Sequence, residues 1–480
     1  MRRKAVLFLA FCMTILLCGC SLKSGDELYT LPEMSVEYES LRNNIQRLLD
    51  SGLEYAAPVS GSNTQPVQEV DLNNDGIGEV VAYFKDSSAS EASLQVHIFA
   101  QNQDGEYEPM TVISGQGSAV NSVTYAQLAD DPYREIVLTW QMSAGVYSLS
   151  VYSIWQGGNE LLMEPKNYTR NVVSDLNGDG ISELILLQLD PTDMSSSRAE
   201  LYTYSDGAMA LGSEAQLSAD LATIERMRSS KLYGGENAIY VTGYVSDPDS
   251  GGVSSNVQLT DILALKDGNL VNVTRSEQSG SSTTTRRRTY VADQDINGDG
   301  IWEVPVLTSL YERLSGGQVA MSETFYLISW IQYDLDGGRH TQSVTYYNSS
   351  DGWYLTVPEN WNNQIAVARS DYNEGSTVER SICFYTLEKI LPNEGANLQL
   401  DDTLGLAVLS NTKAVPLLTI YKNSGSDQYS RARQEGRTVL ETVDQQATYS
   451  VMLFNNERSE WTAEDVQKNL HIIVTDWSSD

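Results

Sequence analysis

The sequence predicts a mainly β protein, in which a β-propeller of about five four-stranded blades is followed by a smaller α+β domain. Three observations lead to this prediction. An acidic nine-residue loop recurs along the chain, and each intact copy leads into a run of β-forming residues. A glycine-containing hairpin turn recurs between the copies of that loop. Both repeats stop near residue 346, where a different pattern begins.

The N-terminus has the layout of a secretory signal. Basic residues at positions 2–4 precede an apolar run over residues 5–17 that contains no acidic residue. This run is too short to cross a bilayer comfortably as a helix. The sequence therefore predicts export from the cytoplasm.

The residues that follow are more specific than a generic signal. Leu-Cys-Gly-Cys at positions 17–20 resembles the lipobox of bacterial lipoproteins. The resemblance implies a signal peptide over residues 1–19, a lipid on Cys20 and a lipid-anchored spacer over residues 20–33. The membrane partner would then be the lipid, and the protein would lie on the extracellular face of the bacterial cell membrane. An ordinary cleaved signal peptide, with Cys20 incidental, is the alternative.

The charge of the chain excludes one class of partner. There are 31 Lys and Arg residues against 64 Asp and Glu residues, which gives a formal net charge of −33. Residues 1–19 carry three basic residues and no acidic one, so their removal makes the charge still more negative. Nucleic acid is not an expected partner, because binding to phosphate needs a basic surface. The charge favours solubility outside the cell.

An amphipathic helix is predicted before the first acidic loop. Leu41, Ile45 and Leu48 lie at helical spacing within residues 35–51. We expect this helix to pack on one face of the propeller, since a packing role is more common for such a helix than binding of a partner.

Three loops share the pattern D-[LI]-N-x-D-G-I-x-E: loop 1 (Asp71–Glu79), loop 3 (Asp175–Glu183) and loop 5 (Asp295–Glu303). Each leads into β-forming residues, whereas an EF-hand loop would lead into a helix. Loop 2 (Gln127–Glu135) is a degenerate copy that keeps the apolar second position and the final Glu. A fainter copy, loop 4, begins near Lys231. The copies lie at blade-sized intervals.

Hairpin turns complete the repeat. Gly-containing pairs at 104–105, 157–158, 206–207, 267–268 and 336–337 are flanked by alternating β-formers. One repeat thus contains four antiparallel strands, as in a propeller blade. Residues 66–70 precede loop 1 without strands of their own blade. We therefore expect them to complete the last blade, after residues 304–347, and to close the ring.

These loops resemble FG-GAP or VCBS repeats, the calcium-loop repeats of integrin-α-type propellers. The segment from about Leu28 to Leu307 also resembles VCBS-repeat lipoproteins of Gram-positive Firmicutes. The resemblance implies that residues 34–345 form an N-terminal helix and a propeller displayed at the cell surface. It further implies recognition of a surface protein or a glycan.

The loop residues suit calcium, which prefers six to eight oxygen ligands. Positions 1, 3, 5 and 9 offer side-chain oxygens, position 6 is a Gly that permits a sharp turn, and position 7 offers its carbonyl oxygen. The absence of thiols and imidazoles from the loops argues against zinc or copper. About three Ca²⁺ sites are expected, although a metal-free turn would also favour Asp, Asn and Gly. The candidate ligands are Asp71, Asn73, Asp75, Ile77, Glu79, Asp175, Asn177, Asp179, Ile181, Glu183, Asp295, Asn297, Asp299, Ile301 and Glu303.

Residues 346–480 are predicted to form a separate α+β domain with long strands. Near its end, Thr462 and Asp465 have the spacing of a capping box and predict the start of a short helix. Cys383 lies in an apolar, strand-like run and is expected to be a buried structural thiol.

No motif points to catalysis. The three His residues lie far apart in the sequence, and no nucleophile-elbow pattern frames a Ser. The basic cluster Arg286–Arg288 is expected at a solvated strand edge. We therefore expect a non-catalytic, calcium-stabilised recognition module. The alternative is a carbohydrate-active enzyme, a glycoside hydrolase or lyase, that uses a propeller face as its cleft.

Overall fold

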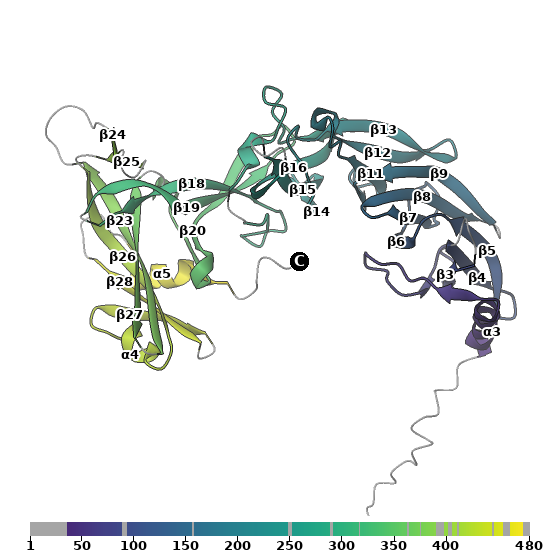
Figure 1. The fold of residues 1–480 in the computed structure, drawn as a ribbon, viewed down its shortest axis with the longest axis horizontal. Coiled ribbons are helices and arrows are strands. Elements are labelled where there is room, and N and C mark those ends of the chain that lie inside the picture. Colours follow the sequence, from purple (N-terminus) through teal and green to yellow (C-terminus); the bar gives the residue numbers. More distant parts are fainter. Residues whose placement is uncertain are drawn as a thin grey trace, which may run out of the picture. The chain divides into compact units, whose positions relative to one another are not determined.

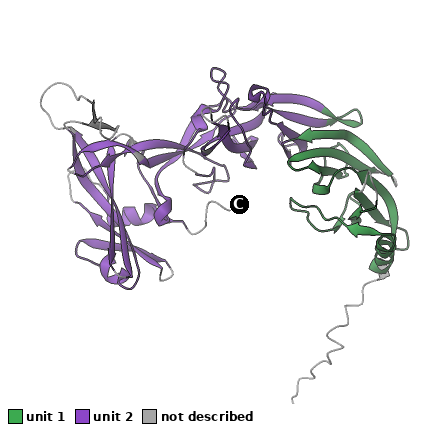
Figure 2. Cartoon of the chain, in the orientation of Figure 1, with its two compact units in different colours: residues 1–168, 204–210 green, residues 169–203, 211–480 purple. Residues whose placement is uncertain are grey.

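The computed structural model describes residues 36–473 with internal gaps (Figure 1). The chain forms two compact units (Figure 2). Unit 1 comprises residues 1–168 and 204–210, and unit 2 comprises residues 169–203 and 211–480. The signal peptide, Cys20 and the spacer lie outside the described residues. The internal gaps are residues 89–93, 156–157, 248–251, 289–290, 316, 362–363, 375, 390–397, 402–405, 410–411, 444–445 and 455–460.

The described chain is mainly β, as predicted, and its strands form five hydrogen-bonded sheets. Sheet 1 contains β1 (Leu53–Tyr55), β2 (Val67–Val70), β3 (Glu79–Asp86), β4 (Leu94–Gln101) and β5 (Tyr107–Gly115). Sheet 2 contains β6 (Ala119–Ala126), β7 (Glu135–Ser143), β8 (Val146–Trp155) and β9 (Gly158–Tyr168). Sheet 3 contains β10 (Arg170–Ser174), β11 (Glu183–Gln188), β12 (Arg198–Ser205) and β13 (Ala208–Gln216). Sheet 4 contains β14 (Arg226–Lys231), β15 (Asn237–Ser246), β16 (Val253–Lys266) and β17 (Asn269–Asn272).

Sheet 5 has twelve strands and includes the whole C-terminal part of the chain. Its strands are β18 (Val304–Arg313), β19 (Val319–Tyr333), β20 (Arg339–Asn348), β21 (Trp353–Thr356), β22 (Ile365–Glu374), β23 (Thr377–Lys389), β24 (Leu398–Asp401), β25 (Leu406–Leu409), β26 (Thr412–Ser424), β27 (Arg437–Val443), β28 (Ala447–Leu453) and β29 (Leu470–Ile472). The helices of the described chain are α3 (Val36–Asp50), α4 (Gln428–Ala432) and α5 (Ala463–Asn469), with 3₁₀ turns η1 (Met194–Ser196), η2 (Thr283–Thr285), η3 (Ser349–Asp351) and η4 (Glu359–Trp361).

The strands that follow loops 1 to 4 are buried on both faces, which explains their continuous apolar sequences, whereas β18, after loop 5, is only half-buried over residues 306–309. In β3, Val81 and Tyr83 pack in a core between sheets 1 and 2, whereas Val80 and Phe84 pack under α3. In unit 2, β15 likewise divides its side chains between a core shared with sheet 3 and a core shared with β18 and β19. Neighbouring sheets within each unit therefore pack through such shared cores.

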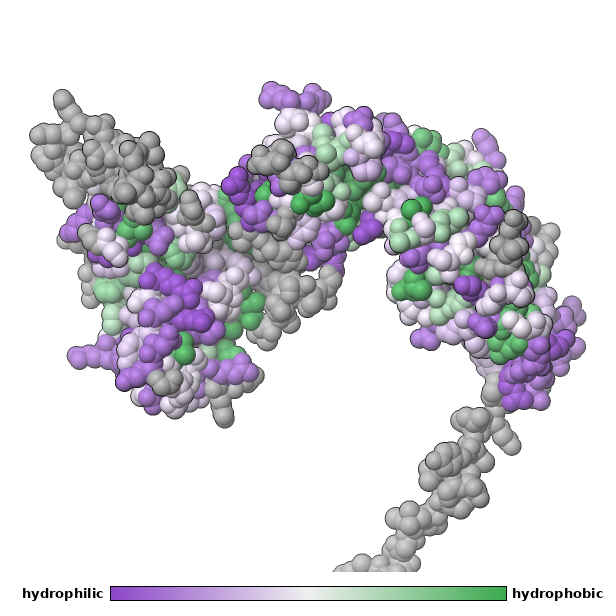
Figure 3. Space-filling model, viewed as in Figure 1, coloured by the Kyte–Doolittle hydropathy of each residue, from purple (hydrophilic) through white to green (hydrophobic). Residues whose placement is uncertain are grey.

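Helix α3 confirms the predicted amphipathic helix. Leu41 and Ile45 lie one turn apart and are buried against Phe84 and Tyr107 of sheet 1. The other face of the helix carries charged residues, and Figure 3 shows hydrophilic residues gathered there. Burial of one apolar face thus holds this helix on unit 1.

Four of the five predicted hairpin turns join consecutive strands, and residue 157 of the remaining pair lies outside the described residues. Asp206 and Gly207 both have positive φ, 53° and 87°, and join β12 to β13. Asp267 and Gly268 do the same between β16 and β17, with φ of 50° and 77°. Two consecutive positive values define the type I′ turn, whose twist matches that of the flanking strands.

The predicted ring closure by residues 66–70 is wrong. These residues form β2, which pairs antiparallel with β3 of the same sheet, with Val70 opposite Glu79. The same holds for β6 with β7 and for β10 with β11. Each nine-residue loop turns the chain back on itself, so the strand before the loop pairs with the strand after it.

The boundary predicted between residues 345 and 346 falls inside β20. β20 pairs with β21, and β18 pairs in parallel with β22, so hydrogen bonding continues across the boundary. The fifth repeat is therefore not a separate four-stranded sheet. Its strands are part of the twelve-stranded sheet, which the change of sequence pattern near residue 346 did not reveal.

The C-terminal part shares one core with β18, β19 and β20, in which Trp353 and Phe384 are buried together with Leu310. The capping box predicted for α5 is confirmed: the Asp465 N–H donates to Thr462 Oγ1 at 3.1 Å, and the Thr462 N–H donates to the Asp465 carboxylate at 2.8 Å. Cys383, on β23, is only partly buried, and burial raises the pKa of its thiol.

Candidate metal centre

The three intact loops occupy equivalent places in their sheets. In loops 1 and 3 the final Glu pairs with the residue just before the first Asp, as in Val70–Glu79 and Ser174–Glu183. In loop 5 the corresponding pair, Gln294 and Glu303, forms an isolated bridge. Each loop is thus a closed turn at the end of a β-hairpin.

The final Glu of each loop is buried and holds the loop together. Glu79 and Glu183 are each 5% exposed, and Glu303 is fully buried. One carboxylate oxygen accepts the backbone N–H of the second loop residue at 2.8 Å in each case, from Leu72, Leu176 and Ile296. Leu72 and Leu176 are buried, while Ile296 is half-buried.

The remaining acidic side chains are gathered by backbone hydrogen bonds. The Asp at position 1 accepts the Gly N–H of position 6 at 2.8–2.9 Å, as in Asp71 and Gly76. The Asp at position 5 accepts the Ile N–H of position 7 at 2.7–2.8 Å, as in Asp75 and Ile77. The Asn side chain at position 3 donates to that Asp at 2.8–3.0 Å. These hydrogen bonds draw the side chains of positions 1, 3 and 5 over the backbone of each loop, and among the described residues only loop 5 brings the carboxylates of positions 1, 5 and 9 within 4.8 Å of one another.

Loop 5 fits a calcium ion most closely. Single carboxylate oxygens of Asp295, Asp299 and Glu303 all lie within 4.8 Å of one another. An ion about 2.3–2.6 Å from each ligand allows ligand oxygens to lie up to about 5 Å apart, so this spacing suits Ca²⁺. All three groups are hard oxygen donors. When bound, the ion would supply positive charge and tie the ends of the loop together.

The loops concentrate negative charge. Burial raises the pKa of Glu79 and Glu183, and the nearby Asp carboxylates of each loop raise it further. Burial raises the pKa of Glu303 to about 7, again with a contribution from Asp299 and Asp295. A cation among these carboxylates would offset both effects.

Sequence reasoning missed one participant, Gln332. Its side-chain amide, on β19, donates to Glu303 at 2.7 Å and to Asp299 at 2.9 Å. Val304 pairs with Ile331, so Gln332 lies beside Glu303 across the strands. Only the register of this hairpin, which the sequence did not specify, could have identified Gln332.

Loop 2 is held differently from the intact loops. Glu135 keeps its bond to the second residue, accepting the Leu128 N–H at 2.7 Å. The side-chain amide of Gln127 donates to the backbone oxygen of Asp131 at 2.7 Å, across the loop. Pro132 replaces the Gly whose φ is positive in the intact loops, and proline cannot adopt such a φ. Side-chain hydrogen bonds thus close this loop.

Loop 4 is a tight turn with a different pattern. The Leu232 N–H donates to the Glu236 carbonyl at 2.8 Å, and Gly235 has a φ of 96°. Its residues do not form an acidic cluster like that of loop 5. The Leu keeps the buried second position of the repeat, since Leu232 is fully buried.

In the basic cluster Arg286 and Arg288 are exposed, whereas Arg287 departs from the prediction of a solvated edge. Arg287 is 2% exposed, and its Nη2 lies 3.3 Å from the carboxylate of Asp293, which is also buried. Arg287 further donates to Thr260 at 3.0 Å and to the Val291 carbonyl at 2.9 Å. Burial of the guanidinium is possible because these acceptors surround it.

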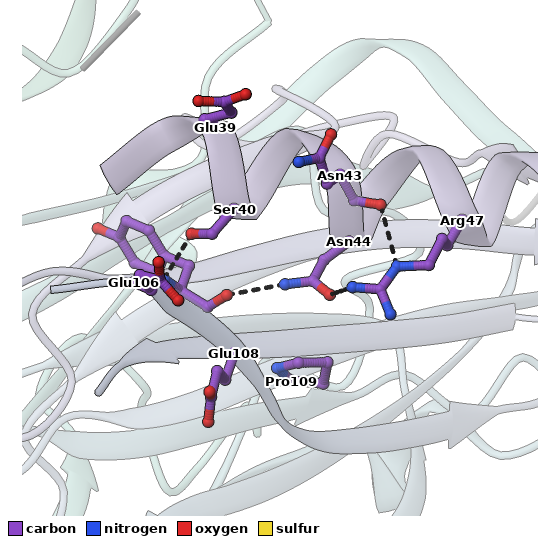
Figure 4. A pocket seen from close by; sticks show the side chains of 9 residues that line it. Glu39, Ser40, Asn43, Asn44, Arg47, Glu106, Glu108 and Pro109 are labelled. Atoms are coloured by element: carbon purple, nitrogen blue, oxygen red, sulfur yellow. Dashed lines mark hydrogen bonds between the residues drawn. The ribbon is translucent and has the colours of Figure 1, made fainter. Parts of the chain in front are cut away.

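A polar pocket of about 580 Å³ lies between α3 and β5 (Figure 4). Asn44 donates to the Tyr107 carbonyl at 2.7 Å, and Arg47 donates to Asn44 at 2.5 Å. The Tyr107 N–H donates to Ser40 at 2.8 Å. These groups dock the helix on the strand, so the pocket belongs to the packing of unit 1.

No candidate catalytic arrangement accompanies the His residues of the described chain. His97 is buried on β4 and hydrogen-bonds to Gln95 at 2.9 Å. His340 hydrogen-bonds to Asp334 at 2.8 Å and stacks on Tyr233. Among the described residues, no helix is both long and apolar enough to cross a membrane.

Known proteins resemble this chain only weakly. No protein-family model matches the chain, and no curated protein matches it. The N-terminal domain of Nup159 is similar over 68% of this chain and 76% of its own, at 11% identity and a TM-score of 0.25. An exo-β-1,3-galactanase from Phanerochaete chrysosporium is similar over 76% of this chain and 92% of its own, at 10% identity and a TM-score of 0.24. Scores this low do not establish a shared fold.

Proposed function

We propose that this protein is a calcium-stabilised recognition module of the bacterial cell surface, anchored in the membrane through a lipid on Cys20. In this proposal the repeated sheets are propeller-type blades, and loops 1, 3 and 5 each bind one Ca²⁺. The outer surfaces of these sheets would contact a surface protein or a glycan. The proposal assigns no catalytic residue.

One observation carries the calcium assignment: the same hydrogen bonds arrange the same acidic side chains in three separate loops, and in loop 5 the three carboxylates also lie within 4.8 Å of one another. A single loop of this kind is also what a metal-free turn would look like, because Asp, Asn and Gly favour turns. Three loops that each bury a Glu beside two Asp carboxylates destabilise the folded protein unless a cation is bound, since like charges repel most strongly where solvent is excluded. The burial of Glu79, Glu183 and Glu303 therefore supports bound calcium.

Support for recognition comes from charge and from the stacked sheets. The chain's formal charge of −33 favours solubility and disfavours binding to nucleic acid. Sheets that share cores within each unit form rigid supports, and their connecting loops are the usual positions for binding residues.

Calorimetric titration of the purified protein with Ca²⁺ tests the calcium assignment. We expect three equivalents per chain, and Asp75→Ala, Asp179→Ala and Asp299→Ala should each remove one. Asp131→Ala is the matched control, because Asp131 occupies the same loop position in loop 2 and should leave the stoichiometry at three. Zero equivalents in the wild type, or unchanged stoichiometry in the three loop variants, would show that the loops are simple turns that bind no metal.

A further inference from the structure

A pocket of about 320 Å³ opens beside the degenerate loop 2, within unit 1. It lies where three strands of sheet 2 end together. Ile136 pairs with Tyr152, so Glu135 lies beside Ser153, and Ser153 pairs with Glu160. The lining residues are Ala129, Asp131, Pro132, Tyr133, Glu135, Ser153, Glu160, Leu162 and Tyr204.

Glu135 is fully buried, and its Oε1 has no hydrogen-bond partner. In loops 1 and 5 the corresponding oxygen is satisfied: Glu79 Oε1 accepts from Asn73 at 2.9 Å, and Glu303 Oε1 accepts from Gln332 at 2.7 Å. Loop 2 has lost both kinds of donor.

The two replacements explain the loss. Ala129 stands where loop 1 has Asn73, and Ser153 stands where loop 5 has Gln332. The alanine side chain has no donor, so only the backbone N–H of Ala129 lies near this carboxyl, where it lowers the pKa of Glu135, and the Ser side chain is shorter than that of Gln. A buried carboxylate oxygen without a donor is costly, so a group that enters the pocket and donates to it would be bound favourably.

The chemistry of the lining selects the class of ligand. Three acidic side chains, Asp131, Glu135 and Glu160, line the pocket, and none of its lining residues is basic. Tyr133 adds an aromatic ring, which also attracts cations, and Leu162 adds an apolar wall.

A metal ion fits this pocket less well than an organic cation does. Among the described residues, Asp131, Glu135 and Glu160 do not form a group whose oxygens all lie within 4.8 Å of one another. The pocket is also much larger than an ion. An ammonium group carried on a short chain can donate to separated carboxylates while its methylene groups contact the apolar wall.

We propose that this pocket binds a small organic cation, an ammonium group on a short aliphatic stem, which donates to Glu135 and the neighbouring carboxylates. The ammonium can come from a free amine or from the Lys side chain of a partner protein. This site is separate from the calcium loops and does not depend on their occupancy.

Titration calorimetry with 1,4-diaminobutane tests the proposal. The purified protein is held in excess calcium, so that the acidic loops are filled, and in about 0.15 M salt, which screens the surface charge. We expect saturable binding of one amine per chain. Glu135→Gln and Glu160→Gln should each weaken binding about tenfold or more, because each removes a charged acceptor of the ammonium. Glu160 is exposed, so its variant remains informative if Glu135→Gln disturbs the loop.

Two controls decide whether the pocket and the charge are responsible. Glu164→Gln makes the same change of charge on the same strand, outside the pocket, and should leave binding unchanged. The neutral analogue 1,4-butanediol should not bind. Equal weakening by Glu164→Gln, equal binding of the diol, or no saturable binding of the amine would each overturn the proposal.

A second probe distinguishes the two sources of the ammonium. Nα-acetyl-lysine amide presents the side chain as a protein would. Tighter binding of this probe than of 1,4-diaminobutane would support a Lys of a partner protein, and the reverse order would support a free amine. Both outcomes require the same dependence on Glu135 and Glu160.

Discussion

Glu303 makes the stability of the calcium-free protein depend on pH. Burial raises the pKa of its carboxyl from the ordinary 4.5 to about 7 in the folded state. Between these values the folded protein holds a proton that the unfolded chain has released. The contribution of Glu303 is therefore fully present below about pH 4.5 and is lost as the pH rises through about 7.

The size of this effect follows from the difference between the two pKa values. A difference of about 2.5 corresponds to roughly 3 kcal/mol in the free energy of unfolding, of which roughly 2–3 kcal/mol is lost between about pH 5 and pH 8. Calcium should abolish the loss, because the ion binds the ionised carboxylate in the folded state.

Urea denaturation in a chelator, from about pH 5 to pH 8, measures this contribution when the wild type is compared with Glu303→Gln. The variant cannot titrate at this position, and its side-chain oxygen can still accept the Ile296 N–H. Other groups, such as Glu79 and Glu183, titrate equally in both proteins, so the difference between the two isolates Glu303. Parallel pH dependences of the two proteins in the chelator would refute the reasoning.

Two further predictions concern the ends of the chain. If Cys20 carries the lipid, Cys20→Ser should move the protein from the membrane fraction to the medium or leave an unprocessed precursor; unchanged fractionation with normal processing would contradict the anchor. Thr462→Ala should remove the capping box of α5, at a cost of about 1 kcal/mol, and speed amide exchange in that helix about fivefold. Unchanged exchange at Val466, whose N–H donates to the Thr462 carbonyl, would show that the cap does not stabilise the helix.

Features decided by local chemistry were predictable from the sequence. The turn at Asp206 and Gly207 requires two residues that tolerate positive φ, and the sequence supplies both. The helix over Val36–Asp50 and the cap at Thr462 also rest on residues within one or two turns of each other. The hydrogen bonds within each acidic loop likewise join residues of one nine-residue segment.

Features decided by strand partners were not predictable. The assignment of β2 to sheet 1 depends on hydrogen bonds that a sequence pattern does not specify, and both possible partners of β2 are apolar strands. The burial of Arg287 depends on Asp293 and Thr260, which surround it only after β16 has folded. Gln332 reaches loop 5 for the same reason, through the register of β18 and β19.

Loop 2 shows which residues of the repeat motif close the loop and which are needed only for the proposed ion. It has lost the Asp at position 1, the Asn at position 3 and the Gly at position 6, yet it keeps Leu128 and Glu135 and the hydrogen bond between them. The apolar second residue and the final Glu are therefore the folding elements of the loop, because they join its two ends with or without a cation. In our proposal the Asp and Asn residues serve the ion. Where they are lost, the buried Glu remains with an oxygen that no donor satisfies, and a pocket lined by carboxylates lies where the intact loops have their proposed calcium site.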